Sequence, residues 1–175
     1  IIVEHSNFKI NNDKLNEWVS TCKGYKERYP YLGPEHKDKN NFINSYKFIS
    51  KLSKHLKEDQ VITTDAGTAL LSGHQAISLD KNQRIMTSTG LGEMGFGLPA
   101  AIGASFGRNK GEVISLNCDG GMMMNLQELQ TIYTHKLNIL IVLLNNSGYL
   151  SIKQTHNNFF NNEIGASPKS NTEFP

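Results

Sequence analysis

One stretch of the sequence, residues 113–149, constrains the fold more than any other. Its pattern predicts a strand, a turn, a helix, a second strand and a second turn. Asp119 ends the first predicted strand, and the pair Asn145-Asn146 ends the second. Two strands joined by one helix run parallel in a right-handed crossover, so both carboxyl ends emerge at the same edge of the sheet. The stretch therefore predicts a βαβ unit that brings Asp119 and Asn146 together.

The side chains at this edge suit one kind of ligand. Open α/β folds bind ligands just beyond the carboxyl ends of their parallel strands. A carboxylate and an amide oxygen, each beside a glycine-rich turn, favour a hard cation that carries a phosphate. The alternative is structural: Asp119 caps a turn, and Asn145-Asn146 adopt left-handed turn conformations, to which both residue types are prone. The residue types and their spacing fit both interpretations.

The rest of the chain continues the alternation of strands and helices. Residues 61–64 and 139–144 predict strands, residues 68–77 and 99–106 predict helices, and residues 78–86 predict a polar connection with a short strand. The strand at 139–144 is apolar on both faces, which is typical of a strand covered by helices on both sides. The expected fold class is therefore α/β, with a doubly wound, mostly parallel sheet and helices on both faces.

The helix of the central stretch has its own start signal. Asn125 and Glu128 have the spacing of a capping box, which places the start of the helix at Asn125. Leu126, Leu129 and Tyr133 then share one face, so we expect that face to point inward.

The first 40 residues differ from the rest. Ile1–Val3 look like part of a strand, and a later helical pattern puts Leu15, Trp18 and Val19 on one face that we expect to be buried. Turn residues and a charged run follow. We expect residues 1–40 to be the end of a preceding central domain and its linker. Residues 41–175 would form a second domain, truncated at its C-terminus, whose first helix runs from Asn41 to about residue 59.

Composition excludes several classes of function. The net charge is +2 and no Lys/Arg-rich stripe carries interleaved aromatic residues, so nucleic acid is not an expected partner. No apolar run approaches the roughly 20 residues that span a bilayer. The N-terminus has no signal peptide pattern, and it lacks an initiator Met, so we expect a piece of a longer protein. Cys22 and Cys118 lie far apart, which favours reduced thiols and a cytoplasmic location.

A second motif competes for the function. Residues 90–95 match G-x-G-x-x-G, the dinucleotide-binding fingerprint, which should directly follow an apolar strand. The preceding residues, 82–89, make a poor strand, and the first carboxylate that ends a later strand is Asp119, too far along the chain. A Rossmann NAD(P) oxidoreductase domain therefore stays open only as a weaker alternative.

Several motifs in the same order resemble one enzyme family. The run CDGG at 118–121, followed by NNSGY at 145–149, resembles the cofactor signature of thiamine diphosphate-dependent enzymes. The segment GLGEMGFGLPAAIGAS at 90–105 is similar to the stretch that precedes that signature in acetolactate synthase-like members. The resemblance covers about residues 42–175 and implies the C-terminal, pyrophosphate-binding domain of such an enzyme.

The resemblance implies roles for individual residues. Mg²⁺ would be held by the carboxylate of Asp119, the side-chain oxygen of Asn146 and the backbone carbonyl of Gly148. The residues implied to contact thiamine diphosphate lie in the turns around that metal site and in the glycine-rich segment: Gly67, Thr68, Gly92, Met94, Gly120, Gly121, Asn146 and Tyr149. Among them, Gly92 would accept the cofactor's amino group on its carbonyl, and Met94 would lie beneath the thiazolium ring.

The sequence departs from the family pattern at three places. Cys118 replaces the usual first glycine of the signature, and Gly121 stands where many members have Ser. Residues 68–70 replace a segment that contains Gln and His in typical acetolactate synthases. The last change weakens the expectation of true acetolactate synthesis.

The resemblance also implies an activity. The substrate would be a 2-oxo acid such as pyruvate, which is decarboxylated and joined to a second carbonyl compound. The activating Glu belongs to a pyrimidine-binding domain, usually of a partner subunit, so no catalytic residue is expected in this fragment and the fragment alone should be inactive. The full-length protein would be a homodimer or homotetramer. Another thiamine diphosphate-dependent 2-oxo acid decarboxylase or lyase, and a non-catalytic relative, stay open.

Overall fold

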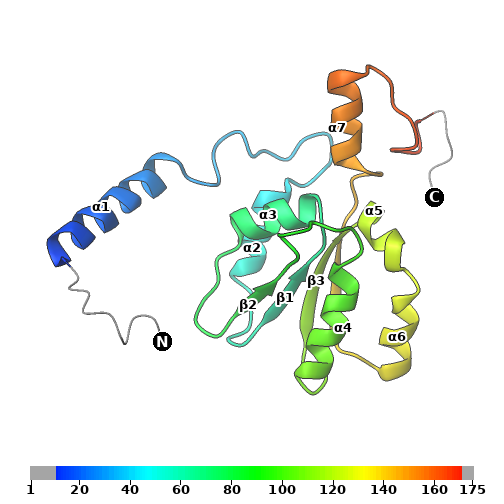
Figure 1. Cartoon of the computed structure of the whole chain (residues 1–175), viewed down its shortest axis with the longest axis horizontal. Helices are drawn as coiled ribbons and strands as arrows, with labels where there is room; N and C mark the ends of the chain where they lie inside the picture. Colours follow the sequence, from blue (N-terminus) through cyan, green and yellow to red (C-terminus); the bar gives the residue numbers. More distant parts are fainter. Residues whose placement is uncertain (1–10, 171–175) are drawn as a thin grey trace. The chain divides into compact units, whose positions relative to one another are not determined.

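The computed structural model describes residues 11–170 in two units, which meet in sequence between Glu35 and His36. Figure 1 shows both units and labels most of their helices and strands. The strand expected at Ile1–Val3 lies outside the described residues. That residues 1–40 end a preceding domain stays a prediction. No helix in residues 11–170 is both long enough and apolar enough to cross a lipid bilayer.

The first unit contains one described helix, α1 (Asn12–Arg28). Asn11 caps it, since its side chain accepts a hydrogen bond from the Lys14 N–H at 3.1 Å. The helix confirms the predicted periodicity, but its apolar face is exposed, with Trp18 62% accessible. The expectation of a buried face is therefore wrong for this structure. The described part of this unit holds no second helix or strand that would cover such a face.

The second unit is built on a four-stranded parallel sheet. Its strands are β1 (Val61–Thr64), β2 (Arg84–Met86), β3 (Val113–Cys118) and β4 (Ile139–Leu144), in the order β2-β1-β3-β4. All three neighbouring pairs are parallel, as predicted. β1 and β3 are buried along their whole length, whereas β4 is one of the two edge strands of the described sheet and exposes Leu140 and Leu143. Complete cover of β4 by helices was therefore a wrong expectation.

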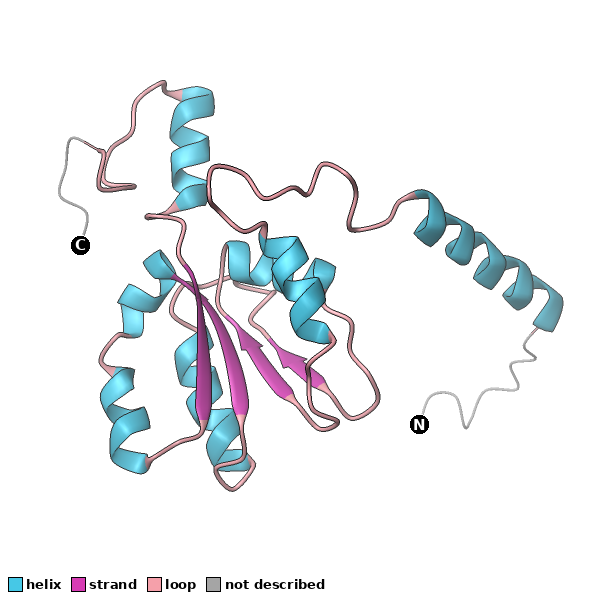
Figure 2. Cartoon of the chain, turned by 180° about the vertical axis from the view of Figure 1, so that it is seen from behind, coloured by secondary structure: helices cyan, strands magenta, loops and turns pink. Residues whose placement is uncertain are grey.

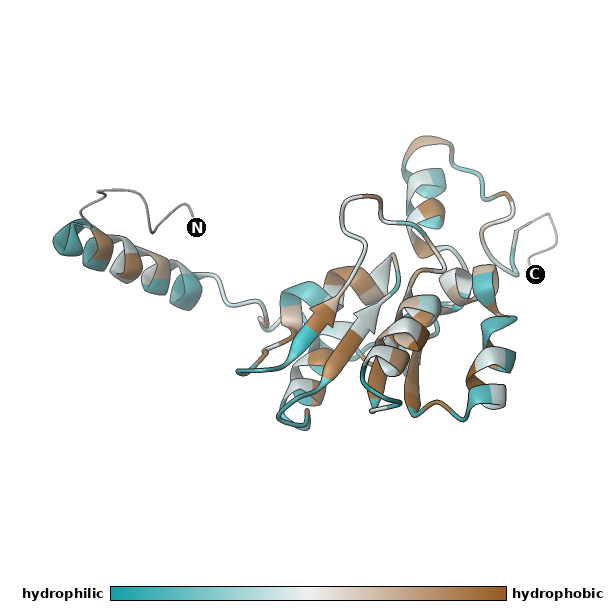
Figure 3. Cartoon of the chain, turned by 60° about the horizontal axis from the view of Figure 1, so that its bottom comes forward, coloured by the Kyte–Doolittle hydropathy of each residue, from teal (hydrophilic) through white to brown (hydrophobic). Residues whose placement is uncertain are grey.

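Helices cover both faces of the sheet (Figure 2). On one face, Ile49 and Ala69 from two helices pack against Ile62, Ile114 and Leu116 of β1 and β3. On the other face, Ala101 packs against Val61 and Val113. Apolar residues accordingly line the strands in Figure 3. The helices are α2 (Ser45–Ser53), α3 (Thr68–Ala76), α4 (Gly97–Gly107), the single turn α5 (Asp119–Met122), the 3-10 turn η1 (Met123–Asn125), α6 (Glu128–His135) and α7 (Leu150–Phe159). This arrangement confirms the doubly wound fold class.

Two predicted helix starts are wrong. The helix expected from Asn41 begins at Ser45, because Asn44 accepts hydrogen bonds from the N–H groups of Tyr46 and Lys47. The helix expected from Asn125 begins at Glu128, and no side chain caps it. Asn125 and Glu128 do have the spacing of a capping box, but the Asn125 side chain donates to the Gly95 carbonyl and does not cap the helix.

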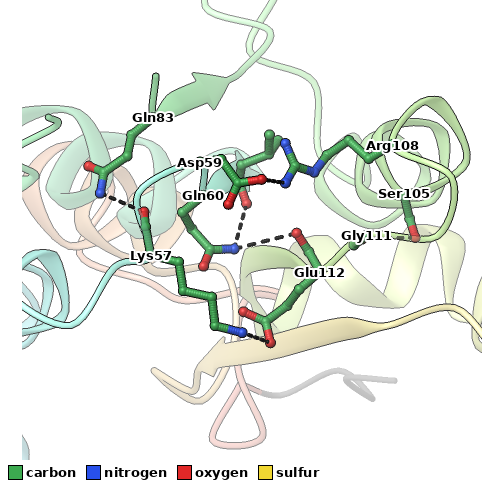
Figure 4. Close-up of polar contacts among 9 residues, drawn as sticks. Lys57, Asp59, Gln60, Gln83, Ser105, Arg108, Gly111 and Glu112 are labelled. Carbon is green, nitrogen blue, oxygen red and sulfur yellow. Dashed lines mark hydrogen bonds and ion pairs between the residues drawn. The ribbon is translucent and has the colours of Figure 1, made fainter. Parts of the chain in front are cut away.

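Polar contacts join the amino ends of the strands (Figure 4). Arg108, which follows α4, forms an ion pair of 2.6 Å with Asp59, and Lys57 forms one of 2.8 Å with Glu112. The Gln83 side chain donates to the Lys57 carbonyl at 2.8 Å. These contacts tie the loops that enter β1, β2 and β3 to one another. Because the strands are parallel, their carboxyl ends all lie at the opposite edge of the sheet.

Candidate functional site

The site lies where the chain changes direction across the sheet. From β1 the chain passes through α3 to β2 on one side, and from β3 it passes through α6 to β4 on the other. The connections that leave the carboxyl ends of β1 and β3 therefore run in opposite directions. The crevice at such a point is the usual ligand site of open α/β sheets. Figure 1 shows α5 and the start of α7 beyond these strand ends.

A pocket opens at this crevice. Its walls come from the turn after β1, the turn after β3, the loop after β4, and Met94: the lining residues are Ala66, Gly67, Thr68, Met94, Cys118, Gly120, Gly121, Asn146, Gly148, Tyr149, Leu150, Ser151 and Ile152. Segments that are far apart in the sequence thus meet as expected. Gly92 and Asp119 are the two predicted residues that do not line the pocket. Leu150, Ser151 and Ile152 do line it, although no motif pointed to them.

Asp119 contacts the backbone of the loop after β4 with both of its carboxylate oxygens. One carboxylate oxygen accepts the Gly148 N–H at 2.8 Å, and the other lies 3.5 Å from the Asn146 nitrogen of the backbone. Ser147 and Gly148 in this loop have positive φ angles of 61° and 122°. Asp119 therefore caps this turn, as the structural alternative required, but the left-handed residues are Ser147 and Gly148, so left-handed conformations at Asn145-Asn146 were a wrong expectation. This capping does not exclude a ligand, because the Asn146 side-chain amide lies 2.6 Å from the Gly148 carbonyl oxygen and 3.1 Å from Asp119 Oδ1.

Three oxygens gather beside this loop. The side-chain oxygen of Asn146 lies 2.6 Å from the Gly148 carbonyl oxygen and 3.1 Å from Asp119 Oδ1, with no hydrogen to share between them. Octahedral Mg²⁺ with bonds of about 2.1 Å keeps neighbouring ligand oxygens about 2.9 Å apart. If the amide turns by 180°, its nitrogen donates to the same two oxygens, which suits a chain without metal. The donor set thus fits a hard divalent cation.

This set differs from a metal centre built from acidic or histidine clusters. In residues 11–170 no group of three or more His, Cys, Asp or Glu side chains lies close enough to hold a metal ion. Only Asp119 would bring a formal charge, and the two other oxygens are neutral. A cation held this way keeps most of its charge and needs further anionic ligands, which diphosphate oxygens would supply.

Two helix starts face the pocket. α3 begins after Gly67, whose φ is 70°, and no side chain caps the helix. The Ala69 N–H at the start of α3 donates to Cys118 Sγ at 3.3 Å, so the cysteine side chain lies against this turn. Gly120 and Gly121 begin the turn α5 after β3. Backbone N–H groups at such starts attract anions, because they lack partners within the helix.

The structure gives a reason for glycine at position 121. A side chain there would collide with the carboxylate of Asp65 unless one of the two shifted. Gly121 thus accommodates the buried Asp65 in this chain.

The glycine-rich segment is split by the fold. Gly92 has a φ of 66° and lies in an exposed turn, where its N–H donates to the Ser88 carbonyl at 2.7 Å. Met94 lines the pocket and is 40% exposed. The segment follows the three-residue strand β2, so it lacks the long apolar strand that a dinucleotide fingerprint needs.

Asp65 is a site residue that the motifs did not reveal. It follows β1, is 1% exposed, and accepts the N–H groups of Ala66 and Gly95 at 2.8 Å each through the same oxygen. Its second oxygen has no hydrogen-bond partner. The sequence offered one signal for Asp65. It is a carboxylate that follows a strand and precedes Ala-Gly, as Asp119 follows β3 and precedes Gly-Gly.

Burial gives Asp65 a distinct pH dependence. Desolvation raises the pKa of its carboxyl, against the lowering effect of N–H groups of Ala66, Gly95, Gly97 and Phe96. The folded chain therefore binds this proton more tightly than the unfolded chain, and the contribution of Asp65 to stability falls as pH rises above about 4. Asp65→Asn removes this titration. In urea unfolding, the stability of wild type relative to Asp65→Asn is expected to decrease between pH 4 and pH 7. A constant or increasing difference would contradict the raised pKa.

A later segment folds back on the loop after β4. The Tyr149 N–H donates to the Ala166 carbonyl at 2.9 Å, and Ala166 and Ser167 are buried. A side chain at Gly148 would collide with that same carbonyl. Position 148 therefore needs glycine both for its positive φ and for this close approach.

Comparison with known proteins agrees with this geometry. The family model described as "Thiamine pyrophosphate enzyme, C-terminal TPP binding domain" matches residues 65–174. The chain is 32% identical over 150 residues to acetolactate synthase isozyme 1 large subunit of Escherichia coli K12, which covers 86% of this chain and 26% of that protein. It is 31% identical over 152 residues to the acetolactate synthase large subunit of Lactococcus lactis, and this alignment covers 87% of this chain and 26% of that protein.

A third relative is more similar over a shorter length. Acetolactate synthase isozyme 2 large subunit of Escherichia coli K12 is 40% identical over 112 residues, or 64% of this chain and 20% of that protein. The chain thus spans about a quarter of the length of these relatives or less. The match begins at Asp65 and includes the turns after β1, β3 and β4 that form the pocket. This chain belongs to the thiamine pyrophosphate enzyme family, as an acetolactate synthase-like C-terminal TPP-binding domain.

Proposed function

We propose that the pocket binds the diphosphate of thiamine diphosphate (thiamine pyrophosphate) through Mg²⁺. Asp119, Asn146 and Gly148 would supply three oxygens to the metal. The observation that carries this proposal is the closeness of the Asn146 amide to Asp119 Oδ1 (3.1 Å) and to the Gly148 carbonyl oxygen (2.6 Å), because an amide with its oxygen turned toward them puts three oxygens together. Gly120 and Gly121 at the start of α5, with Gly67 and Thr68 at the start of α3, would offer N–H groups and a hydroxyl to the phosphates.

The other predicted contacts concern the organic part of the cofactor. Met94 lines the pocket from the glycine-rich segment and would lie beneath the thiazolium ring. Tyr149 lines it after β4 and would contact the cofactor there. Gly92 does not line the pocket, so its carbonyl would accept the cofactor's amino group from the exposed turn that precedes Met94.

In a complete enzyme this domain would take part in the decarboxylation and carboligation of a 2-oxo acid such as pyruvate. Bound thiamine diphosphate would supply the reactive carbon, and these residues would hold and orient it. We propose that the activating Glu comes from a pyrimidine-binding domain of a partner subunit in a homodimer or homotetramer. Because the chain spans about a quarter of its relatives, we expect it to bind cofactor weakly and to form no product alone.

One observation favours a substrate other than that of a typical acetolactate synthase. The Thr68 hydroxyl lies 3.5 Å from the Asn146 amide nitrogen, at the place where the family's Gln/His-containing segment begins. A Thr-Ala-Leu start of α3 offers fewer polar groups to the pocket than that segment would. Another thiamine diphosphate-dependent 2-oxo acid decarboxylase or lyase is therefore the second candidate.

Calorimetric titration tests the proposed ligand. Thiamine diphosphate with Mg²⁺ is expected to give a saturable heat that EDTA removes, whereas NAD⁺ is expected to give none. The same preparation, assayed with pyruvate, is expected to release no CO₂ and form no acetolactate. Binding of NAD⁺ in place of thiamine diphosphate would favour the Rossmann alternative, and product formation would show that the chain holds a complete active site.

A further inference from the structure

Side chains hold the backbone of Gly95 at both its N–H and its carbonyl. Its N–H donates to Asp65 Oδ1 at 2.8 Å, and its carbonyl accepts from Asn125 Nδ2 at 2.8 Å. The Gln127 side chain donates to Asn125 Oδ1 at 3.1 Å, which is consistent with the amide nitrogen of Asn125 pointing at Gly95. Gly95 itself is buried. We call this arrangement the Gly95 clamp, formed by Asp65, Gly95 and Asn125.

The clamp connects three parts of the pocket wall. Asp65 follows β1, directly before the turn that starts α3, and Asn125 ends η1, directly after the turn that follows β3. Gly95 belongs to neither segment and comes from the loop between β2 and α4. The clamp therefore ties the glycine-rich loop to the two turns that face the proposed diphosphate.

The fit at Gly95 leaves no room for a side chain. Its φ is 87°, and a Cβ there would lie 2.8 Å from both Asn125 Nδ2 and Met124 Cβ. Such close approach fixes the path of the loop against η1. Met94 is the preceding residue, and its side chain lines the pocket. The position of Met94 thus depends on the backbone of Gly95, whose two flanking peptide units are each held by one of these hydrogen bonds.

We propose that Asp65 and Asn125 are positioning residues that hold Met94 against the ring part of the ligand. This inference rests on the proposed function, because it takes the ligand to be thiamine diphosphate. Neither residue lines the pocket. Both act through Gly95, so their loss releases the glycine-rich loop while the metal-binding oxygens of Asp119, Asn146 and Gly148 keep their places.

The test compares thiamine diphosphate with inorganic pyrophosphate, which has the diphosphate but no rings. Both ligands are titrated with Mg²⁺ into wild type, Asn125→Ala, Asp65→Ala and Asp65→Asn by calorimetry, with far-UV circular dichroism to check folding. Losing one hydrogen bond to the loop is expected to weaken thiamine diphosphate about 10-fold in the two alanine variants. Pyrophosphate affinity is expected to change less than about threefold. Asp65→Asn keeps an acceptor oxygen for the Gly95 N–H, so it is expected to keep most of the thiamine diphosphate affinity that Asp65→Ala loses.

Gln130→Ala is the matched control. It truncates an exposed side chain whose amide donates to Thr134 Oγ1 at 3.0 Å on the same helix, and it should leave both affinities unchanged. Equal weakening of both ligands, or no weakening of either, in Asn125→Ala would overturn the inference. Asn125 is only half-buried, so this variant keeps the test valid if Asp65→Ala does not fold. A wild-type chain that binds neither ligand would overturn the proposed function, and this inference with it.

Discussion

Asp119→Ala is expected to abolish Mg²⁺-dependent binding of thiamine diphosphate, with an affinity loss of at least about 100-fold. The carboxylate would be the one charged protein ligand of the metal, and it also accepts the Gly148 N–H at 2.8 Å, which positions the Gly148 carbonyl. Removing it takes away one metal ligand and releases a second. Calorimetric titration with and without Mg²⁺ measures the effect directly.

Two further variants separate charge from loop geometry. Asp119→Asn keeps an oxygen that can accept the Gly148 N–H but loses the negative charge, so it is expected to retain the loop and still bind the metal poorly. Asp80→Ala removes an exposed carboxylate in the connection between α3 and β2, and binding should equal that of wild type. Unchanged cofactor binding in Asp119→Ala would remove Asp119 from the metal site.

Gly97→Ala is expected to destabilise the domain by about 3 kcal/mol, which lowers Tm by about 6–12 °C. A Cβ at Gly97 would lie 2.6 Å from Asn117 Oδ1 and 2.9 Å from the Asp65 backbone nitrogen. That nitrogen donates to the Leu116 carbonyl in the sheet at 2.8 Å, so it cannot move aside. The start of α4 would have to lift off the sheet. The buried hydroxyls of Thr63 and Ser115, which both bond the Gly97 carbonyl, would then lose an acceptor.

Gly103→Ala is the matched control on the same helix. A Cβ at Gly103 meets nothing within 4 Å, so only helix propensity changes, and Ala is expected to stabilise the domain by up to about 1 kcal/mol. Thermal unfolding followed by circular dichroism compares both variants with wild type. If Gly97→Ala unfolds at the wild-type temperature, α4 does not pack as closely on the sheet as this structure has it.

Much of the fold was predictable from local pattern. The strands 61–64 and 139–144 lie where the apolar runs put them, because buried parallel strands consist of such runs. The turns after β1, β3 and β4 carry the glycine, Asp and Asn residues that punctuate an α/β chain. The meeting of Asp119 and Asn146 followed from topology alone, since consecutive parallel strands end at one edge.

Errors arose where a residue's partner is distant in sequence. Asn125 and Glu128 have capping-box spacing, yet Asn125 donates to Gly95, which is 30 positions away. The apolar face of α1 has helical spacing, yet it is exposed, because periodicity shows which side chains share a face and not what covers them. Asp65 looked like an ordinary strand end, and only packing against Gly95 and Gly121 gives it a role.

The sequence by itself determined the parallel α/β fold, the family and the oxygens that gather at one edge of the sheet. These follow from residue periods, short motifs and the handedness of one crossover, all of which act over short stretches of chain. Only the tertiary structure decided that Gly92 lies outside the pocket and that Asp65 and Asn125 hold the backbone of Gly95 between them. Close packing sets these positions, since atoms from three separate segments must share one volume.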